Sequence, residues 1–313
     1  MNFGIIGTNW ITDRFIQAAS AHSSFQIGAV YSRTEETGKA FAEKYQVENV
    51  YTDLEDMFKS GDIEAVYIAS PNVFHAEQSI LALENGIHVL CEKPAVTSVE
   101  EMDLVIQTSQ KYGVLFMEAM KSTVTPSFLN IEKHLEKIGP IRRFVFHYNQ
   151  YSSRYDRYKN GIIENAFKPE LGNGAKTDLG VYAVAPIVHL VGEPLSVLKN
   201  NYLLSTGAEG QGSMILNYDG FEAVVMYSKI TDSFLPSEIQ GENGVIEIDH
   251  ISGPAQVIIK YRDGKTEDIS VTHEFDTMYY EVDEFISCVE NRQIESTINT
   301  HEISRQVVKI LTM

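Results

Sequence analysis

Strand-like apolar runs alternate with helical patterns through the first 120 residues, and this alternation constrains the fold more than any other feature. Strands are expected at 3–7, 25–31, 65–69, 88–91 and 114–117, and helices at 10–21, 35–45, 74–85 and 98–111. Consecutive strands with a helix between them run parallel and are joined by right-handed crossovers. The sequence therefore predicts an α/β domain over residues 1–120, built on a doubly wound parallel sheet.

The pattern changes after residue 120. Closely spaced strands with hairpin signals dominate 195–270, where Asp219-Gly220, Asn243-Gly244 and Asp263-Gly264 separate apolar runs. Other elements are expected as helices at 127–137, 177–191, 275–290 and 301–312, a long strand at 141–151 and a loop at 152–176. These features predict a second, α+β domain over residues 121–313, rich in antiparallel strands.

Composition narrows the class of protein. The chain has 313 residues, 43% of them hydrophobic, and a net charge of −18, which disfavours nucleic-acid and anionic-membrane surfaces. Its two cysteines, Cys91 and Cys288, show no CxxC spacing, which is typical of a reducing cytoplasm. We find no signal peptide, no membrane-spanning run and no metal-ligand spacing among the histidines. We therefore expect a cytoplasmic protein with no metal and no nucleic-acid or membrane partner.

The turn after the first strand is a candidate nucleotide site. Gly7-Thr8-Asn9-Trp10-Ile11-Thr12 partly matches the G-x-G-x-x-G/A fingerprint, with Gly7 in the first slot and Asn9 in the second. Asn9 departs from the glycine of this slot, although asparagine tolerates a left-handed backbone better than most residues. The turn predicts pyrophosphate binding at the start of the first helix, and the alternative is an ordinary strand–helix turn.

The end of the second strand bears on the cofactor. NAD enzymes usually carry an acidic residue there for the ribose 2′-hydroxyl, but this chain has Tyr31-Ser32-Arg33-Thr34. A hydroxyl and a guanidinium suit a 2′-phosphate, which a carboxylate would repel. The sequence therefore favours NADP over NAD, with a solvated surface arginine as the alternative for Arg33.

Three further residues suggest chemistry. Lys93 ends the apolar run Val89-Leu90-Cys91-Glu92-Lys93, and Pro94 stops the strand, which places an ammonium group at the mouth of the sheet. Asp178 and Tyr182 are spaced i, i+4 on the helix at 177–191 and share one of its faces, with Gly180 expected to leave room for a ligand. The alternatives are a salt-bridged lysine, a buried tyrosine and a carboxylate stabilised at a helix N-terminus.

These segments resemble the glucose–fructose oxidoreductase / inositol dehydrogenase / MocA (Gfo/Idh/MocA) family of NAD(P)-dependent oxidoreductases. The resemblance rests on Ala69-Ser70-Pro71-Asn72-Val73-Phe74-His75, on Glu92-Lys93-Pro94, on Met117-Glu118-Ala119 and on the stretch from Phe167 to Tyr182. Many members have histidine at the position of Tyr182. With a tyrosine there, the chain resembles the branch that contains dihydrodiol dehydrogenase. The arginine that relatives often carry before the proline matched by Pro126 is missing, and Lys121 is a possible substitute for its charge.

The resemblance implies a Rossmann domain, a second domain on an open, mostly antiparallel sheet, and an active site between them. It implies hydride transfer between nicotinamide and a carbinol or carbonyl carbon of a sugar, polyol or diol. Lys93 and Tyr182 would transfer the proton, with Asp178 accepting a substrate hydroxyl or fixing Lys93. A tyrosine has a reference pKa of about 10 and needs a nearby cation to act as a base. The cofactor-binding residues would be Gly7, Thr8, Asn9, Trp10, Ile11, Ser32, Arg33, Ser70, Pro71, Asn72, His75, Glu92 and Lys93.

Several alternatives stay open. Glu92 is either a ligand of the nicotinamide ribose or a solvent-facing side chain, and His75 is either a cofactor contact or a surface histidine. The protein itself could be a dinucleotide-binding regulator without turnover, or a lyase or glycosidase that cycles a tightly bound NAD. An open sheet with apolar residues on its free face also predicts a homodimer or larger homo-oligomer.

Overall fold

The computed structural model describes residues 1–313, which pack as two compact units. The first unit comprises 1–119 and 275–308, and the second comprises 120–274 and 309–313. These units differ from the expected ranges 1–120 and 121–313 in where the C-terminal helices pack. The physical reason is apolar burial, because α9 (Thr277–Glu290) places Met278, Val282 and Phe285 in the core of the first unit.

A six-stranded sheet forms the centre of the first unit, and all its neighbouring strands run parallel in the order β3-β2-β1-β4-β5-β6. The strands are β1 (Asn2–Ile6), β2 (Gln26–Tyr31), β3 (Asn49–Tyr51), β4 (Ala65–Ile68), β5 (His88–Glu92) and β6 (Phe116–Ala119). The helices are α1 (Trp10–Ala19), α2 (Glu35–Tyr45), α3 (Leu54–Lys59), α4 (His75–Glu84), α5 (Val99–Tyr112), α9 and most of α10 (His301–Thr312). The predicted doubly wound sheet is confirmed, and β3 with α3 is an addition that the sequence did not predict.

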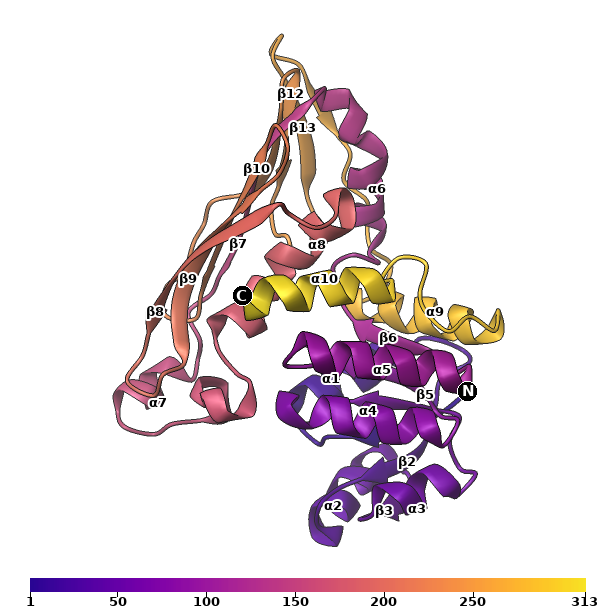
Figure 1. The fold of residues 1–313 in the computed structure, drawn as a ribbon. Coiled ribbons are helices and arrows are strands. Elements are labelled where there is room, and N and C mark those ends of the chain that lie inside the picture. The colour runs from indigo at the N-terminus through magenta and orange to yellow at the C-terminus, as the bar shows by residue number, and fades with distance from the viewer. The chain divides into compact units, whose positions relative to one another are not determined.

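Helices cover both faces of this sheet. One apolar cluster joins α1 and α9 to one face, where the Phe3 and Phe285 rings lie 5.6 Å apart between centroids. The other cluster joins α3, α4 and α5 to the opposite face, and α4 and α5 lie side by side there (Figure 1). Local sequence sets the helix ends, since Thr34, Asp53 and Ser98 accept hydrogen bonds from backbone N–H groups of the first turns that they cap. Burial on both faces explains why these strands are apolar throughout.

The second unit holds an eight-stranded sheet in the order β14-β13-β12-β11-β7-β10-β9-β8. Its strands are β7 (Ile141–Asn149), β8 (Ser196–Leu203), β9 (Glu209–Asn217), β10 (Glu222–Ser228), β11 (Ser237–Gly241), β12 (Gly244–Ile248), β13 (Val257–Tyr261) and β14 (Thr266–Asp268). Only β7 and β10 pair in parallel. The three expected hairpins are confirmed, because β9–β10, β11–β12 and β13–β14 are antiparallel pairs joined at the Asp-Gly and Asn-Gly turns.

Helical segments cover one face of this second sheet. The π-helical turn η5 (Lys176–Gly180) leads into α8 (Val181–Val191), and both pack on β7 and β10 (Figure 1). The other helices of the unit are α6 (Pro126–His134) and the short α7 (Tyr155–Lys159), which lies in the segment expected to be a loop. No helix of either unit is long and apolar enough to cross a bilayer.

The opposite face of the sheet carries a row of apolar side chains. Leu198, Ile215, Val224 and Val145 occupy neighbouring register positions on four adjacent strands, β8, β9, β10 and β7. Leu198 is 62% exposed and Ile215 is 37% exposed. This unit therefore presents an apolar stripe that its own helices leave uncovered.

Candidate active site

The turn after β1 has the geometry of a dinucleotide-binding turn. Gly7 has φ +107°, and a Cβ built on it would lie 2.5 Å from the carbonyl oxygen of Ala69. A side chain at this position is therefore excluded both by backbone conformation and by space. Thr8 and Asn9 then lead into α1, whose first residues Trp10 and Ile11 begin the helix. The free N–H groups of a helix start suit a pyrophosphate.

Asn9 acts here as a helix cap. Its Oδ1 accepts a hydrogen bond of 2.9 Å from the Ile11 N–H, and its Nδ2 donates one of 2.8 Å to the Ala69 carbonyl. Its φ is −100°, so the backbone at Asn9 is extended and not left-handed. Asparagine is suited to this second slot because its amide both caps α1 and joins the β1 turn to the end of β4.

The loop after β2 contains the residues expected at a 2′-phosphate. Ser32 is buried, and its backbone N–H donates to the Tyr51 carbonyl at 3.0 Å. Arg33 is exposed on the loop that precedes α2. No carboxylate occurs between Tyr31 and Thr34, so the only charged side chain in this loop is a cation.

His75 joins two loops at the carboxyl ends of the strands. Its ring is buried, with Nε2 2.8 Å from the Ser70 carbonyl oxygen and Nδ1 3.0 Å from that of Pro94. Burial lowers the pKa of the imidazole, although the two carbonyl groups oppose that shift. The alternative of a surface histidine is wrong, and any influence of His75 on a cofactor would pass through the loops that it connects.

The loop after β4 begins at Ser70, whose hydroxyl donates to Gln78 Oε1 at 2.7 Å. Pro71 precedes the short helical turn η1 (Asn72–Phe74), and Asn72 is half-buried at its start. Together with His75 at the first position of α4, these residues make a compact, internally bonded loop. The loop thus presents Ser70, Pro71 and Asn72 at the carboxyl end of the sheet.

Glu92 and Lys93 occupy the end of β5. Tyr67 donates its hydroxyl to Glu92 Oε1 at 2.6 Å, and the Lys93 backbone N–H lies 3.2 Å from Oε2. Glu92 is buried, so the solvent-facing alternative for this residue is wrong. On the neighbouring strand, Glu118 accepts a hydrogen bond of 3.0 Å from the Ala95 N–H, and burial raises the pKa of its carboxyl. Lys93 itself is half-buried next to Glu92, and its positive charge opposes the rise in the pKa of Glu118.

The second unit carries Asp178 and Tyr182. The Tyr182 ring packs against the Tyr148 ring at 5.7 Å between centroids, and the Lys121 ammonium lies 5.8 Å from the centroid of Tyr182. Lys121 therefore places positive charge near Tyr182, where the family arginine is missing. Gly180 serves packing, since a Cβ on it would lie 2.9 Å from the Tyr227 ring, and this differs from the ligand clearance expected from sequence.

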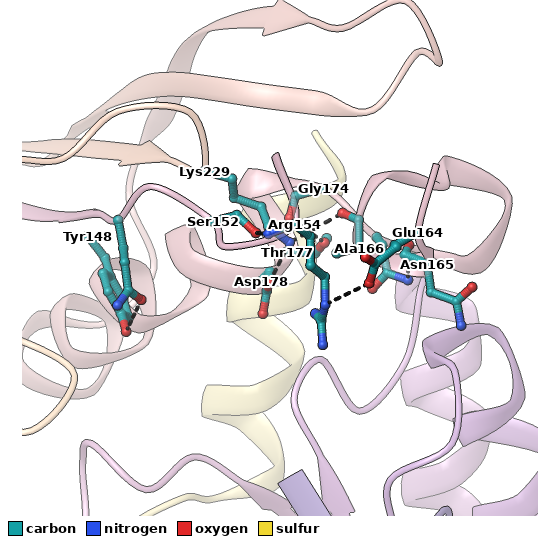
Figure 2. A network of polar contacts seen from close by, with 12 residues as sticks. Tyr148, Ser152, Arg154, Glu164, Asn165, Ala166, Gly174, Thr177, Asp178 and Lys229 are labelled. Carbon is teal, nitrogen blue, oxygen red and sulfur yellow. Dashed lines mark hydrogen bonds and ion pairs between the residues drawn. The ribbon is translucent and has the colours of Figure 1, made fainter. Parts of the chain in front are cut away.

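Sequence reasoning missed Lys229. This lysine directly follows β10, is buried, and donates from Nζ to Asp178 Oδ2 at 2.6 Å (Figure 2). The available signal was a lysine directly after an apolar strand, which is the same signal that identified Lys93. Asp178 is thus part of an ion pair within the second unit.

The structure brings the candidate cofactor residues together at one edge of the first sheet. β1, β4 and β5 are adjacent, and their carboxyl ends carry Gly7, Ser70 and Lys93. Asn9 links the first loop to the second, and His75 links the second to the third. Ligands of open α/β sheets bind at this edge, so these loops fit a dinucleotide.

Known proteins resemble this chain over nearly its whole length. Residues 1–120 match the family model GFO_IDH_MocA, described as an oxidoreductase family with an NAD-binding Rossmann fold. The scyllo-inositol 2-dehydrogenase (NADP(+)) IolU of Bacillus subtilis (strain 168) is 48% identical over 311 residues, which cover 99% of this chain and 95% of that protein. The trans-1,2-dihydrobenzene-1,2-diol dehydrogenase of Xenopus tropicalis is 28% identical over 323 residues, with the same two coverages of 99% and 95%.

Solved structures share the fold. A levoglucosan dehydrogenase in complex with NADH and levoglucosan superposes with a TM-score of 0.87 at 20% identity, covering 99% of this chain and 95% of that one. The 3-ketoreductase KijD10 from Actinomadura kijaniata in complex with NADP gives a TM-score of 0.84 at 22% identity, again covering 99% and 95%. At these identities the likeness establishes the fold, and the predicted fold class, a Rossmann domain followed by an open, mostly antiparallel sheet, is confirmed.

Proposed function

Because this chain belongs to the Gfo/Idh/MocA family of oxidoreductases, we propose that it oxidises a ring hydroxyl of an inositol with NADP as the cofactor. It is an NAD(P)-dependent dehydrogenase that acts on CH–OH groups of sugar or polyol substrates. The observation that carries the finer proposal is the 48% identity to a scyllo-inositol 2-dehydrogenase (NADP(+)) over 99% of the chain. The overall change is CH–OH plus NADP⁺ to C=O plus NADPH and one proton.

The chain's own residues would handle the proton. NADP, when bound, supplies the site to which hydride is transferred. We propose that Tyr182 accepts the proton of the substrate hydroxyl and that the Lys93 ammonium favours the tyrosinate form. Lys93 would also stabilise negative charge that develops on the substrate oxygen. Asp178 would accept a hydrogen bond from a second substrate hydroxyl, which orients the ring.

The loops of the first unit would hold the dinucleotide. The Gly7 turn and the start of α1, with Thr8, Asn9, Trp10 and Ile11, fit the pyrophosphate. Ser32 and Arg33 fit a 2′-phosphate. Support comes from the cradle at Gly7, which any side chain would fill, and from the single cation on the β2 loop. Ser70, Pro71, Asn72, Glu92 and Lys93 would lie along the nicotinamide ribose, with His75 holding their loops.

Cofactor preference gives the first testable prediction. NADP(H) should bind more tightly than NAD(H), and Arg33→Ala should narrow the difference by weakening NADP(H) alone, because only NADP carries the phosphate that the guanidinium would pair with. Titration calorimetry with both cofactors measures this. Arg157→Ala, which removes an exposed arginine of α7 in the second unit, is the control. Equal affinities of the wild-type protein for the two cofactors would contradict the assignment of Arg33.

The function is tested with a panel of inositols, aldoses, polyols and diols, followed by the absorbance of reduced nicotinamide. Turnover of scyllo-inositol with NADP⁺ above every other member of the panel is the expected result. A dinucleotide-binding regulator would bind NADP and turn over nothing. A lyase or glycosidase would consume its substrate without net formation of reduced cofactor, so product analysis beside the absorbance assay separates all three.

Assembly is part of the same proposal. The apolar stripe of Leu198, Ile215, Val224 and Val145 supports a homodimer or larger closed homo-oligomer, because soluble monomers rarely expose such a row. Light scattering at micromolar concentration should give a multiple of the 35.2 kDa chain mass. Leu198→Glu should shift the mass toward the monomer, whereas Leu104→Glu, at an exposed position of α5, should not. A monomer mass for the wild-type protein would refute this prediction.

A cytoplasmic location also belongs to the proposal. Cys91 and Cys288 are both buried as free thiols, and burial raises the pKa of each. Buried thiols that form no disulfide suit a reducing compartment, in which the reduced and oxidised nicotinamide cofactors are also available.

A further inference from the structure

Lys229 is held rigidly by its backbone at the end of β10. Its N–H donates to the Gly210 carbonyl at 2.8 Å, and its own carbonyl accepts from the Ser152 N–H at 2.9 Å. These two bonds tie Lys229 to Gly210 in β9 and to Ser152, which follows β7. The sheet therefore fixes the position of the Lys229 Cα, from which the side chain extends.

The Lys229 ammonium is enclosed by partners. Its Nζ donates to Asp178 Oδ2 at 2.6 Å and to the Ala166 carbonyl at 3.2 Å, and it lies 5.4 Å from the centroid of the Phe167 ring. Only 4% of the side chain is exposed. A buried ammonium is stable only when paired and hydrogen-bonded in this way, so the contact with Asp178 is an obligatory one.

Asp178 differs from its partner in exposure. The Asp178 side chain is 39% exposed, so the ion pair consists of a buried ammonium and a partly exposed carboxylate. A molecule that approaches this pair from solvent meets hydrogen-bond acceptors. It must therefore supply donors, as the hydroxyl groups of a polyol do.

The turn that carries Asp178 has few other conformations available. Its neighbours are each fixed, since Lys176 pairs with Glu209 at 3.4 Å and the Thr177 hydroxyl donates to the Gly172 carbonyl at 3.1 Å. Gly180 packs on the Tyr227 ring. A π-helical turn of this kind is rare and is found frequently at functional sites.

We propose that Lys229 is a positioning residue for substrate recognition, which fixes the Asp178 carboxylate so that it accepts a hydrogen bond from a hydroxyl of an uncharged polyol. The inference rests on the proposed function, because it assigns Asp178 to the substrate. It adds that the specificity for a hydroxyl at that ring position depends on a buried lysine that the substrate does not touch. Loss of the ammonium would remove the ion pair from the Asp178 carboxylate and leave the Ala166 carbonyl without its donor.

The test measures kinetics of the full chain with NADP⁺ and scyllo-inositol. Lys229→Met should lower kcat/KM by about tenfold to a hundredfold, mostly through a higher KM, because a hydrogen bond to a charged group is lost. The dissociation constant for NADP should stay unchanged, which also shows that the variant is folded. Lys229→Gln, which keeps a neutral donor, is the second variant if Lys229→Met does not fold. Lys260→Met, which removes an ion-paired lysine of β13 in the same sheet but away from the Asp178 turn, is the matched control.

A double variant separates positioning from simple stability. If Lys229 acts through Asp178, the pair Asp178→Asn/Lys229→Met should lose no more kcat/KM than Asp178→Asn alone. Losses that multiply in the double variant would overturn the proposal, and so would a Lys229→Met variant whose KM matches that of Lys260→Met. The substrate panel with the wild-type protein tests the proposed function separately. A wild-type protein that oxidises no member of the panel would refute the proposed function, whatever the Lys229 variants show.

Discussion

Tyr182→Phe should lower turnover by about a hundredfold to ten-thousandfold, the usual contribution of a general acid–base group. The change keeps the ring, and with it the packing on Tyr148 and the approach of the Lys121 ammonium, and removes only the hydroxyl. NADP affinity should stay close to wild type. Steady-state kinetics with deuterated substrate measure the effect and show whether the chemical step limits the rate.

Lys93→Met tests the other residue of the proposed proton-transfer pair, Tyr182 and Lys93. It keeps the apolar stem and removes the charge, so turnover should fall and the pH–rate profile of the remaining activity should move to higher pH, because a tyrosine without a nearby cation ionises later. The double variant should lose much less than the product of the two single losses, since the residues act as one unit.

The matched control for this pair is Tyr148→Phe. It removes a neighbouring hydroxyl whose partner is Gln150 at 3.2 Å, and it should change turnover only slightly. Near-normal turnover of Tyr182→Phe on the true substrate, with chemistry limiting, would contradict the assignment. The proton would then pass through another group, and Tyr182 would be a packing residue.

Gly7→Ala should lower both the stability of the first unit and its affinity for the cofactor. A side chain at φ +107° adopts a backbone region that costs about 1–3 kcal/mol, and its Cβ must also displace the Ala69 carbonyl from 2.5 Å. That carbonyl accepts the hydrogen bond of Asn9, so the helix start would move with it. We expect NADP affinity to fall by at least about tenfold, which corresponds to 1.4 kcal/mol.

Gly86→Ala is the control for Gly7→Ala. Gly86 has φ +79°, but no atom lies within 4 Å of a Cβ built there. It should therefore show the backbone cost alone, with a smaller loss in the urea midpoint and unchanged NADP affinity. Calorimetric titration and urea unfolding of both variants provide the comparison. Equal losses in the two variants would mean that the Ala69 contact has no role.

The sequence predicts an element correctly where the apolar pattern of its residues matches the faces that the fold buries. The strands of the first unit are apolar because both sheet faces are covered, and the hairpins of the second unit carry Asp-Gly or Asn-Gly turns, so both could be predicted. The strand β3 and the helix α3 could not, because three and six residues are too few to show a period. The segment with α7 has tyrosines and charges without a helical period, which made it resemble a loop.

The candidate site also contains residues that the sequence could identify and residues that it could not. Residue type and strand position identified Gly7 and Lys93, because the chemistry of a strand end depends on local sequence. Burial of Glu92 and His75 depends on neighbours far along the chain, such as Tyr67 and Pro94, and so could not be foreseen. The pairing of Lys229 with Asp178 spans 51 residues and follows from the tertiary fold alone.

The packing of α9 in the first unit bears on how the protein matures on the ribosome. Phe285 and Val282 complete a core whose other members, such as Phe3 and Phe15, leave the ribosome long before them. Domains usually fold one after another as the N-terminal part emerges. Here the nascent N-terminal domain would keep an uncovered apolar face until residues 277–290 have been made. A fragment that ends at residue 119 would expose this face and would be prone to aggregation.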